Sequence, residues 1–315
     1  MRRALAIVMI AALPLALRPL AAQEQRRVEA SPAEVALSQG RLDDAERELY
    51  AASRRAPREP SARGALGQLL ASRGHLRIGA ALLEEARQFG GDASSINGRL
   101  THIYRWLGDW AALAALPTGA AYDGAEKERA RWIAAHIGAT RGADSTTVRV
   151  EPNEVAGFGR ISLRIGTVDL LADLDPTIDG IALKVNADLL GGLQLFGERD
   201  GVTLAVAPSV AVGSVVWTNV PVTVERSGTA RIGFDVIAAL TPTFDAAGRT
   251  LTLRVNNETP AGGREIPIWL GFPGVRIVAR AGQAPVAIES AAGRAALRGS
   301  AWTLSLKRGA IIVRE

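Results

Sequence analysis

The sequence predicts a chain of two parts, an α-helical array followed by an all-β domain. Over residues 31–138 the chain is rich in Ala, Leu and Arg at helical spacing, and three glycines recur at one fixed interval. From about Ala143 onward, Val, Ile, Thr and Gly increase, and alternation replaces the helical period. A length of 315 residues is sufficient for two hydrophobic cores. We therefore predict a multidomain α and β protein.

The first 22 residues are typical of a secretory signal peptide. Arg2 and Arg3 precede an apolar stretch over residues 4–17, and small residues around Ala22 offer a cleavage site. The apolar stretch is shorter than the roughly 20 residues that a transmembrane helix needs. We therefore expect cleavage before Gln23, a periplasmic or secreted protein, and no integral membrane span after cleavage. An uncleaved membrane anchor is the alternative.

Composition and charge exclude several classes of function. The chain contains no cysteine, which excludes disulfides, thiolate metal sites and a lipidated thiol anchor. The formal charge is +5, but Arg2, Arg3 and Arg18 would leave with the signal, so that 34 basic residues remain against 32 acidic ones. These bases alternate with acids along the predicted helices. Nucleic acid is therefore not the expected partner.

The three recurring glycines define the helical array. Gly40, Gly74 and Gly108 are 34 residues apart. Each is followed two positions later by a bulky apolar residue: Leu42, Leu76 and Trp110. A period of 34 residues is typical of tetratricopeptide repeats, in which a glycine permits the tight turn between paired helices. Residues 31–138 resemble that family, which implies protein binding or packing onto the second domain.

The third repeat departs from the pattern of the first two. Pro117 follows Gly108 by nine residues and should end the second helix of that unit early. One more helix is predicted over residues 124–138. The three histidines of the chain fall in this region without a shared spacing, and we interpret them as surface or seam residues: His75, His102 and His136.

The second part of the chain contains short alternating runs separated by turn dipeptides. The predicted strands are residues 146–150, 160–165, 168–174, 201–206, 209–212, 221–225 and 249–255, with several more after Ile266. We assign residues 145–255 to one all-β domain with one or two short helices. Residues 256–315 form a C-terminal β extension of unknown role. Within that extension, residues 285–291 faintly echo a strand that leads into a catalytic turn, but they are interpreted as ordinary β structure.

Several segments of the β domain resemble retropepsin-like aspartic proteases. Asn-Val-Pro-Val at 219–222, Arg-Ile-Gly-Phe-Asp at 231–235 and the predicted hairpin at 244–253 are similar to the inner strand, the hydrophobic-Gly turn with its helix, and the closing hairpin of that family. Asp175 falls on the position of the family's catalytic Asp-Thr-Gly turn. Leu183 falls on the helix that follows it, and residues 190–193 on the end of that helix. The resemblance covers residues 162–254 and implies an acid-protease barrel.

The same resemblance implies a catalytic role for the turn. Asp175 would be the acid/base residue that activates water for peptide-bond hydrolysis, and a homodimer through the β domain would supply the second carboxylate. Ile232 and Gly233 would form the structural turn beside it. Neither a metal nor another cofactor is expected. Pro176 replaces the family's threonine and removes a hydroxyl and an N–H, and Thr177 places a β-branched residue in the glycine position.

These two departures predict impaired hydrolysis, so that both an active peptidase and a pseudoenzyme stay open. The alternative function is a non-catalytic scaffold that binds a peptide or protein in the cell envelope through the helical array. A purely structural role is the third hypothesis. The surrounding carboxylates are interpreted as a solvated edge or turn, neither a cation site nor a substitute catalytic turn: Asp169, Asp173 and Asp179.

Overall fold

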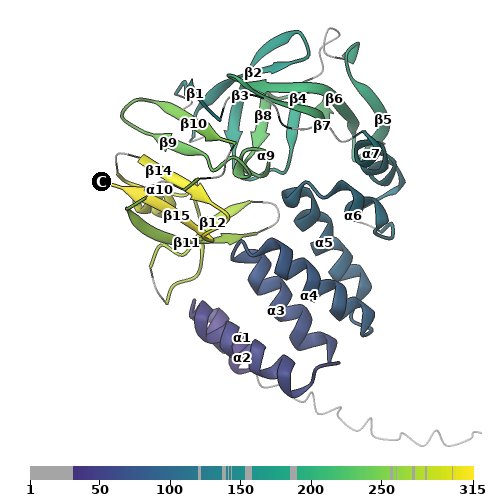
Figure 1. The fold of residues 1–315 in the computed structure, drawn as a ribbon, viewed down its shortest axis with the longest axis vertical. Helices are drawn as coiled ribbons and strands as arrows, with labels where there is room; N and C mark the ends of the chain where they lie inside the picture. The colour runs from purple at the N-terminus through teal and green to yellow at the C-terminus, as the bar shows by residue number, and fades with distance from the viewer. Residues whose placement is uncertain are drawn as a thin grey trace, which may run out of the picture.

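The computed structural model describes residues 31–119, 122–136, 140, 142, 144–152, 158–184, 190–255, 258–259, 261–271, 274–280, 282–299 and 301–315. The predicted signal peptide, residues 1–22, lies outside the described residues. Helices occupy the amino-terminal part of the chain and two β-sheets the rest (Figure 1). This arrangement confirms the predicted multidomain α and β class. Within the part described, no helix combines the length and the apolar character that crossing a membrane requires.

Three consecutive helix pairs and one further helix build the array. Its helices are α1 (Pro32–Ser38), α2 (Leu42–Arg55), α3 (Pro60–Ser72), α4 (Leu76–Gln88), α5 (Ala93–Leu107), α6 (Trp110–Ala115) and α7 (Gly124–Ala135). The recurring glycines Gly40, Gly74 and Gly108 stand between the paired helices with φ of 67°, 88° and 64°, a conformation that glycine adopts without strain. Helix α6 has only 6 residues, as the position of Pro117 predicts.

A seven-stranded sheet closes on itself as a barrel. Its strands are β2 (Arg160–Ile165), β3 (Val168–Asp175), β4 (Ile181–Lys184), β5 (Gln194–Arg199), β6 (Val202–Val212), β7 (Val215–Glu225) and β8 (Ala230–Gly233). The strand order is β2-β3-β8-β4-β7-β6-β5, and β2 also pairs with β6. Leu183 was expected on a helix, and that expectation is wrong. The residue is buried in β4 because Ile181 to Lys184 pair in parallel with β7.

An eight-stranded sheet joins the end of the predicted β domain to the C-terminal extension. It contains β1 (Ser145–Arg149), β9 (Thr243–Asp245), β10 (Thr250–Arg254), β11 (Arg264–Leu270), β12 (Val275–Ile277), β13 (Val286–Ala287), β14 (Ala301–Ser305) and β15 (Ala310–Arg314). The order is β1-β10-β9-β14-β15-β11-β12-β13. The expected boundary at residue 255 therefore falls within one continuous sheet.

Two strand-helix-hairpin units meet at the centre of this sheet. The first is β8, α9 (Phe234–Ala238), β9 and β10, and the second is β13, α10 (Ala291–Ala296), β14 and β15. Strands β9 and β14 pair antiparallel, and the buried hydroxyls of Thr243 and Thr303 lie 2.8 Å apart across that pair. The segment 285–291, interpreted from sequence as ordinary β structure, contains β13 and then turns into α10.

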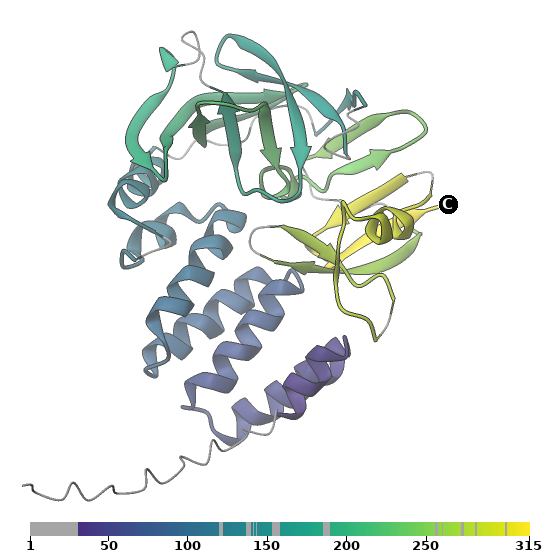
Figure 2. The same cartoon turned by 180° about the vertical axis from the view of Figure 1, so that it is seen from behind.

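The helical array packs tightly on both sheets. One hydrophobic cluster of buried residues runs from α3–α7 through the barrel and into β11–β15. At the far end of the array, Val278 and Trp269 of the C-terminal part join a second cluster with α1–α3. The array and the sheets lie side by side in both views (Figures 1 and 2). A shared core of this kind positions α5 directly against the barrel.

Candidate functional site

The predicted catalytic turn begins where β3 ends, at Asp175. The backbone N–H and the hydroxyl of Thr177 both donate to Oδ1 of Asp175, at 2.9 and 2.5 Å. A carboxylate that accepts from the residue two positions ahead is the usual way in which Asp stabilises a turn. Thr177 therefore stabilises the turn locally, and one carboxylate oxygen of Asp175 is engaged by its own loop.

The other carboxylate oxygen of Asp175 faces a cation. Arg231, on the neighbouring strand β8, places one guanidinium nitrogen 3.4 Å from Oδ2 of Asp175 and donates with another to Glu225 at 2.7 Å. The Asp175 side chain is 18% exposed, so this ion pair is only partly screened by water. Arg231 thus contacts the second carboxylate oxygen of the predicted catalytic residue and links it to Glu225.

The turn is also covered by its own chain. The carbonyl of Pro176 accepts a hydrogen bond from the N–H of Val275, the first residue of β12, at 3.2 Å. Residues 271–275 read Gly-Phe-Pro-Gly-Val and contain no acid. Val275, which contacts the turn, therefore contributes no second carboxylate.

The two residues expected as a structural turn do lie beside Asp175. Ile232 is fully buried in β8, and Gly233 is the register partner of Asp175 in the parallel β3–β8 pair. The N–H of Gly233 donates to the carbonyl of Gly180 at 2.7 Å. Gly233 thus connects the start of the turn with its end.

Two further carboxylates, Asp179 and Asp235, lie at that end of the turn. Asp235 is half-buried, and the N–H of Gly180 donates to its two oxygens, both at 2.9 Å. Asp179 accepts from the indole N–H of Trp106 at 3.1 Å and lies 2.7 Å from Nδ1 of His102. Burial, together with the charge of Asp179, raises the pKa of Asp235 to about 7. We call Asp179, Asp235 and His102 the carboxylate corner.

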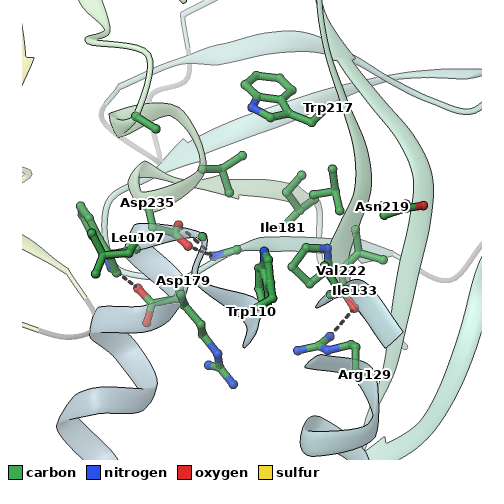
Figure 3. A pocket seen from close by; sticks show the side chains of 18 of the residues that line it. Leu107, Trp110, Arg129, Ile133, Asp179, Ile181, Trp217, Asn219, Val222 and Asp235 are labelled. Carbon is green, nitrogen blue, oxygen red and sulfur yellow. Dashed lines mark hydrogen bonds between the residues drawn. The ribbon is translucent and has the colours of Figure 1, made fainter. Parts of the chain in front are cut away.

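The carboxylate corner opens into a cavity of about 330 Å³ between the helical array and the barrel (Figure 3). Apolar side chains form most of its wall: Trp106, Leu107, Trp110, Ile133, Ile181, Trp217, Val220, Pro221, Val222 and Val236. Its dimensions are those of a small-molecule or side-chain pocket, in which an apolar wall surrounds a few polar groups.

A buried ion cluster forms another side of the cavity. Glu126 of α7 accepts from Arg105 at 2.8 Å and from Arg129 at 2.7 Å. Arg129 also donates to the carbonyl of Val222 at 2.9 Å, and this contact joins α7 to β7 (Figure 3). Burial lowers the pKa of Arg129, and the charge of Glu126 opposes that shift. These contacts hold the cavity wall in place.

The sequence did not reveal the carboxylate corner. His102 was interpreted as a surface or seam residue because no acid stands near it at helical spacing, yet its partner Asp179 lies 77 residues away. The acids 169, 173, 175 and 179 do not form a cluster, since Asp169 pairs with Arg164 and Asp173 accepts from Thr229. Among the described residues, no group of three metal-ligating side chains is suited to a metal ion.

Comparison with solved structures gives a weak likeness. No protein-family model and no curated protein matches the chain. The solved structure of a retropepsin-like aspartic protease from Rickettsia conorii is 16% identical, covers 36% of this chain and 92% of that chain, and superimposes with a TM-score of 0.29. A likeness of this size concerns the barrel fold at most and assigns no catalytic residue.

Proposed function

We propose that this chain is an exported retropepsin-like homologue that has lost peptide hydrolysis and acts as a peptide- or protein-binding scaffold. The observation that carries the proposal is the state of Asp175, whose two carboxylate oxygens are engaged by Thr177 and Arg231. In this binding role, the tetratricopeptide-like array supplies the surface that recruits the peptide or protein. Apolar side chains that face solvent on α2 and α4 support this role, with Tyr50 and Ile78 each 57% exposed.

Aspartic-protease chemistry requires two carboxylates that share one proton and hold one water between them. The described partner of Oδ2 of Asp175 is the guanidinium of Arg231, at 3.4 Å, and not a second carboxylate. A homodimer that brought a second Asp175 to the turn would first have to displace β12 from the Pro176 carbonyl. Both features argue for binding without hydrolysis.

The proposal is tested with the mature chain, a mixed peptide library at acid and neutral pH, and an aspartic-protease inhibitor of the transition-state type. We expect no inhibitor-sensitive cleavage from the wild type or from Asp175→Asn. The matched control is Asp169→Asn, which removes an exposed carboxylate paired with Arg164 on the same barrel. Cleavage that the inhibitor blocks, and that Asp175→Asn but not Asp169→Asn abolishes, would establish a working peptidase and refute the proposal.

A further inference from the structure

We infer that the cavity between α5 and β7 binds the ammonium or guanidinium group of a basic peptide side chain. The inference rests on the proposed binding function and names a ligand class for it. The cavity lies beyond the predicted catalytic turn, and none of Asp175, Pro176 or Thr177 lines it. Charge, aromatic walls and unpaired polar atoms each favour this kind of ligand.

The carboxylate corner is short of positive charge. At the end of the turn, the negative charge of Asp179 acts on Asp235. In the described ion pairs, the partner of these two carboxylates is the imidazole of His102, which pairs with Asp179. Neither carboxylate forms an ion pair with a Lys or Arg in the part of the chain described. Arg105 acts on Asp235 from a distance, but its guanidinium is paired with Glu126 at 2.8 Å. A monocation in the cavity would supply the missing charge.

The walls next to the corner suit a cation with an apolar stem. Trp106, Trp110 and Trp217 line the same cavity, from α5, α6 and β7. An ammonium or guanidinium over an indole face gains from the negative charge of the ring's π system, and the gain increases when water is excluded. A volume of about 330 Å³ admits a side chain and excludes a folded partner.

Two unpaired polar atoms give an independent sign of a ligand. The buried Nε of Arg129 and the hydroxyl of Thr218 have no hydrogen-bond partner among the described residues, and both residues line the cavity. Arg129 is only 5% exposed. Buried polar groups are nearly always hydrogen-bonded, because an unpaired one costs stability. Both groups can donate, so they favour a ligand that also carries an acceptor, such as the peptide carbonyl beside a basic side chain, over a bare metal ion.

Binding should be linked to protonation of the corner. The charged groups that act on Asp235 are Asp179 from the turn and Arg105 from α5, and the incoming cation would join them. Because burial and Asp179 raise the pKa of Asp235 to about 7, this carboxyl is partly protonated at pH 6. A bound cation favours the ionised form. Binding at pH 6 should therefore release protons, and binding at pH 8 should release fewer.

The test uses Nα-acetyl-arginine amide as the probe and Nα-acetyl-citrulline amide as its neutral isostere. Affinity for the mature full chain is measured by calorimetry in two buffers of different ionisation enthalpy, which also counts released protons. We expect the citrulline probe and the variant Asp179→Asn each to weaken binding about tenfold or more. Asp169→Asn, on the outer barrel, is the matched control and should bind as the wild type does.

A second variant keeps the inference testable if Asp179→Asn is poorly folded by circular dichroism. Trp217→Leu removes a half-buried ring from the wall without touching the hydrogen bonds of the corner, and we expect binding several-fold weaker. The inference is overturned by absence of binding at millimolar arginine probe, by equal affinity for the two probes, or by a neutral effect of Trp217→Leu. Cleavage that depends on Asp175, together with normal probe binding, would refute only the proposed loss of hydrolysis.

Discussion

Asp175 and Asp179 stand four residues apart on one turn and belong to two carboxylate sites with opposite environments. Asp175 is held by Thr177 and Arg231 and is covered by β12. Asp179, with Asp235, lies in a low-dielectric corner with one imidazole partner and an adjoining cavity. The resemblance to proteases makes Asp175 the candidate functional residue. Burial, charge and the adjoining cavity instead favour the carboxylate corner.

The difference teaches that the position of an acid in a motif does not decide its chemistry. A carboxylate beside an arginine is stable as an anion and has little tendency to exchange protons. A carboxylate buried beside another acid is costly as an anion and therefore responds to pH and to cations. Three changes test whether the two sites are distinct.

The largest effect is expected from Gly233→Ala, which disturbs both sites together. A Cβ on Gly233 would lie 2.5 Å from the carbonyl oxygen of Ile178 and 2.5 Å from Oδ1 of Asp235. We expect a loss of about 3 kcal/mol or more in the free energy of unfolding, measured by urea denaturation.

The control for that change is Gly180→Ala. The carbonyl of Gly180 accepts the hydrogen bond that the N–H of Gly233 donates. Gly180 has φ of 79° but nothing within 4 Å of an added Cβ, so the cost should stay at about 1–2 kcal/mol. An equal loss in the free energy of unfolding for the two variants would mean that the close contacts of Gly233 with Ile178 and Asp235 do not hold the turn beside the carboxylate corner.

A smaller effect, confined to the corner, is expected from Asp235→Asn. The pKa of Asp235 is raised from 3.8 to about 7 in the folded chain, so the folded state binds more protons than the unfolded state between those values. The contribution of Asp235 to the stability of the wild type is therefore fully present below about pH 4 and is lost as the pH rises through 7, by a value on the order of 3 kcal/mol. The asparagine variant should lack most of this slope in urea midpoints measured from pH 4 to pH 8. A slope that persists in the variant would place the titration on another group.

The smallest effect, confined to the predicted catalytic turn, is expected from Arg231→Met. This change leaves Asp175 and Glu225 without their shared cation, and since Arg231 is 30% exposed the loss should be roughly 1 kcal/mol. Arg164→Met removes the partner of Asp169 at a site that is 61% exposed and should cost less stability than Arg231→Met. A change in arginine-probe affinity caused by Arg231→Met would show that the turn and the corner are coupled.

Local patterns in the sequence predicted the helical array and several strands, but β4 (Ile181–Lys184) and β5 (Gln194–Arg199) were not among the predicted strands. The 34-residue period predicts the starts of α2, α4 and α6, and alternation predicts β2 and most of β3, which the structure has at 160–165 and 168–175. Leu183 was misassigned because the resemblance to the protease family places a helix after the catalytic turn. In the structure, pairing with β7 places Leu183 in a strand.

The site was harder to predict because its contacts are distant in sequence. Arg231 reaches Asp175 across 56 residues, and His102 reaches Asp179 across 77. Contacts between residues so far apart in the sequence leave no periodic pattern. The pairing of residues 256–315 with β9 could not be predicted for the same reason. Only the fold brings β12 onto Pro176 and the helices onto the barrel.

The strand order of the eight-stranded sheet has a consequence for biosynthesis. Strands β14 and β15 stand between β9 and β11 in space, although they come last along the chain. Until the ribosome has released residue 314, β9 and β11 each keep an edge without a neighbour, and an unpaired edge invites association with other chains. A premature stop codon before β14 would thus leave this sheet in two pieces, each with an open edge.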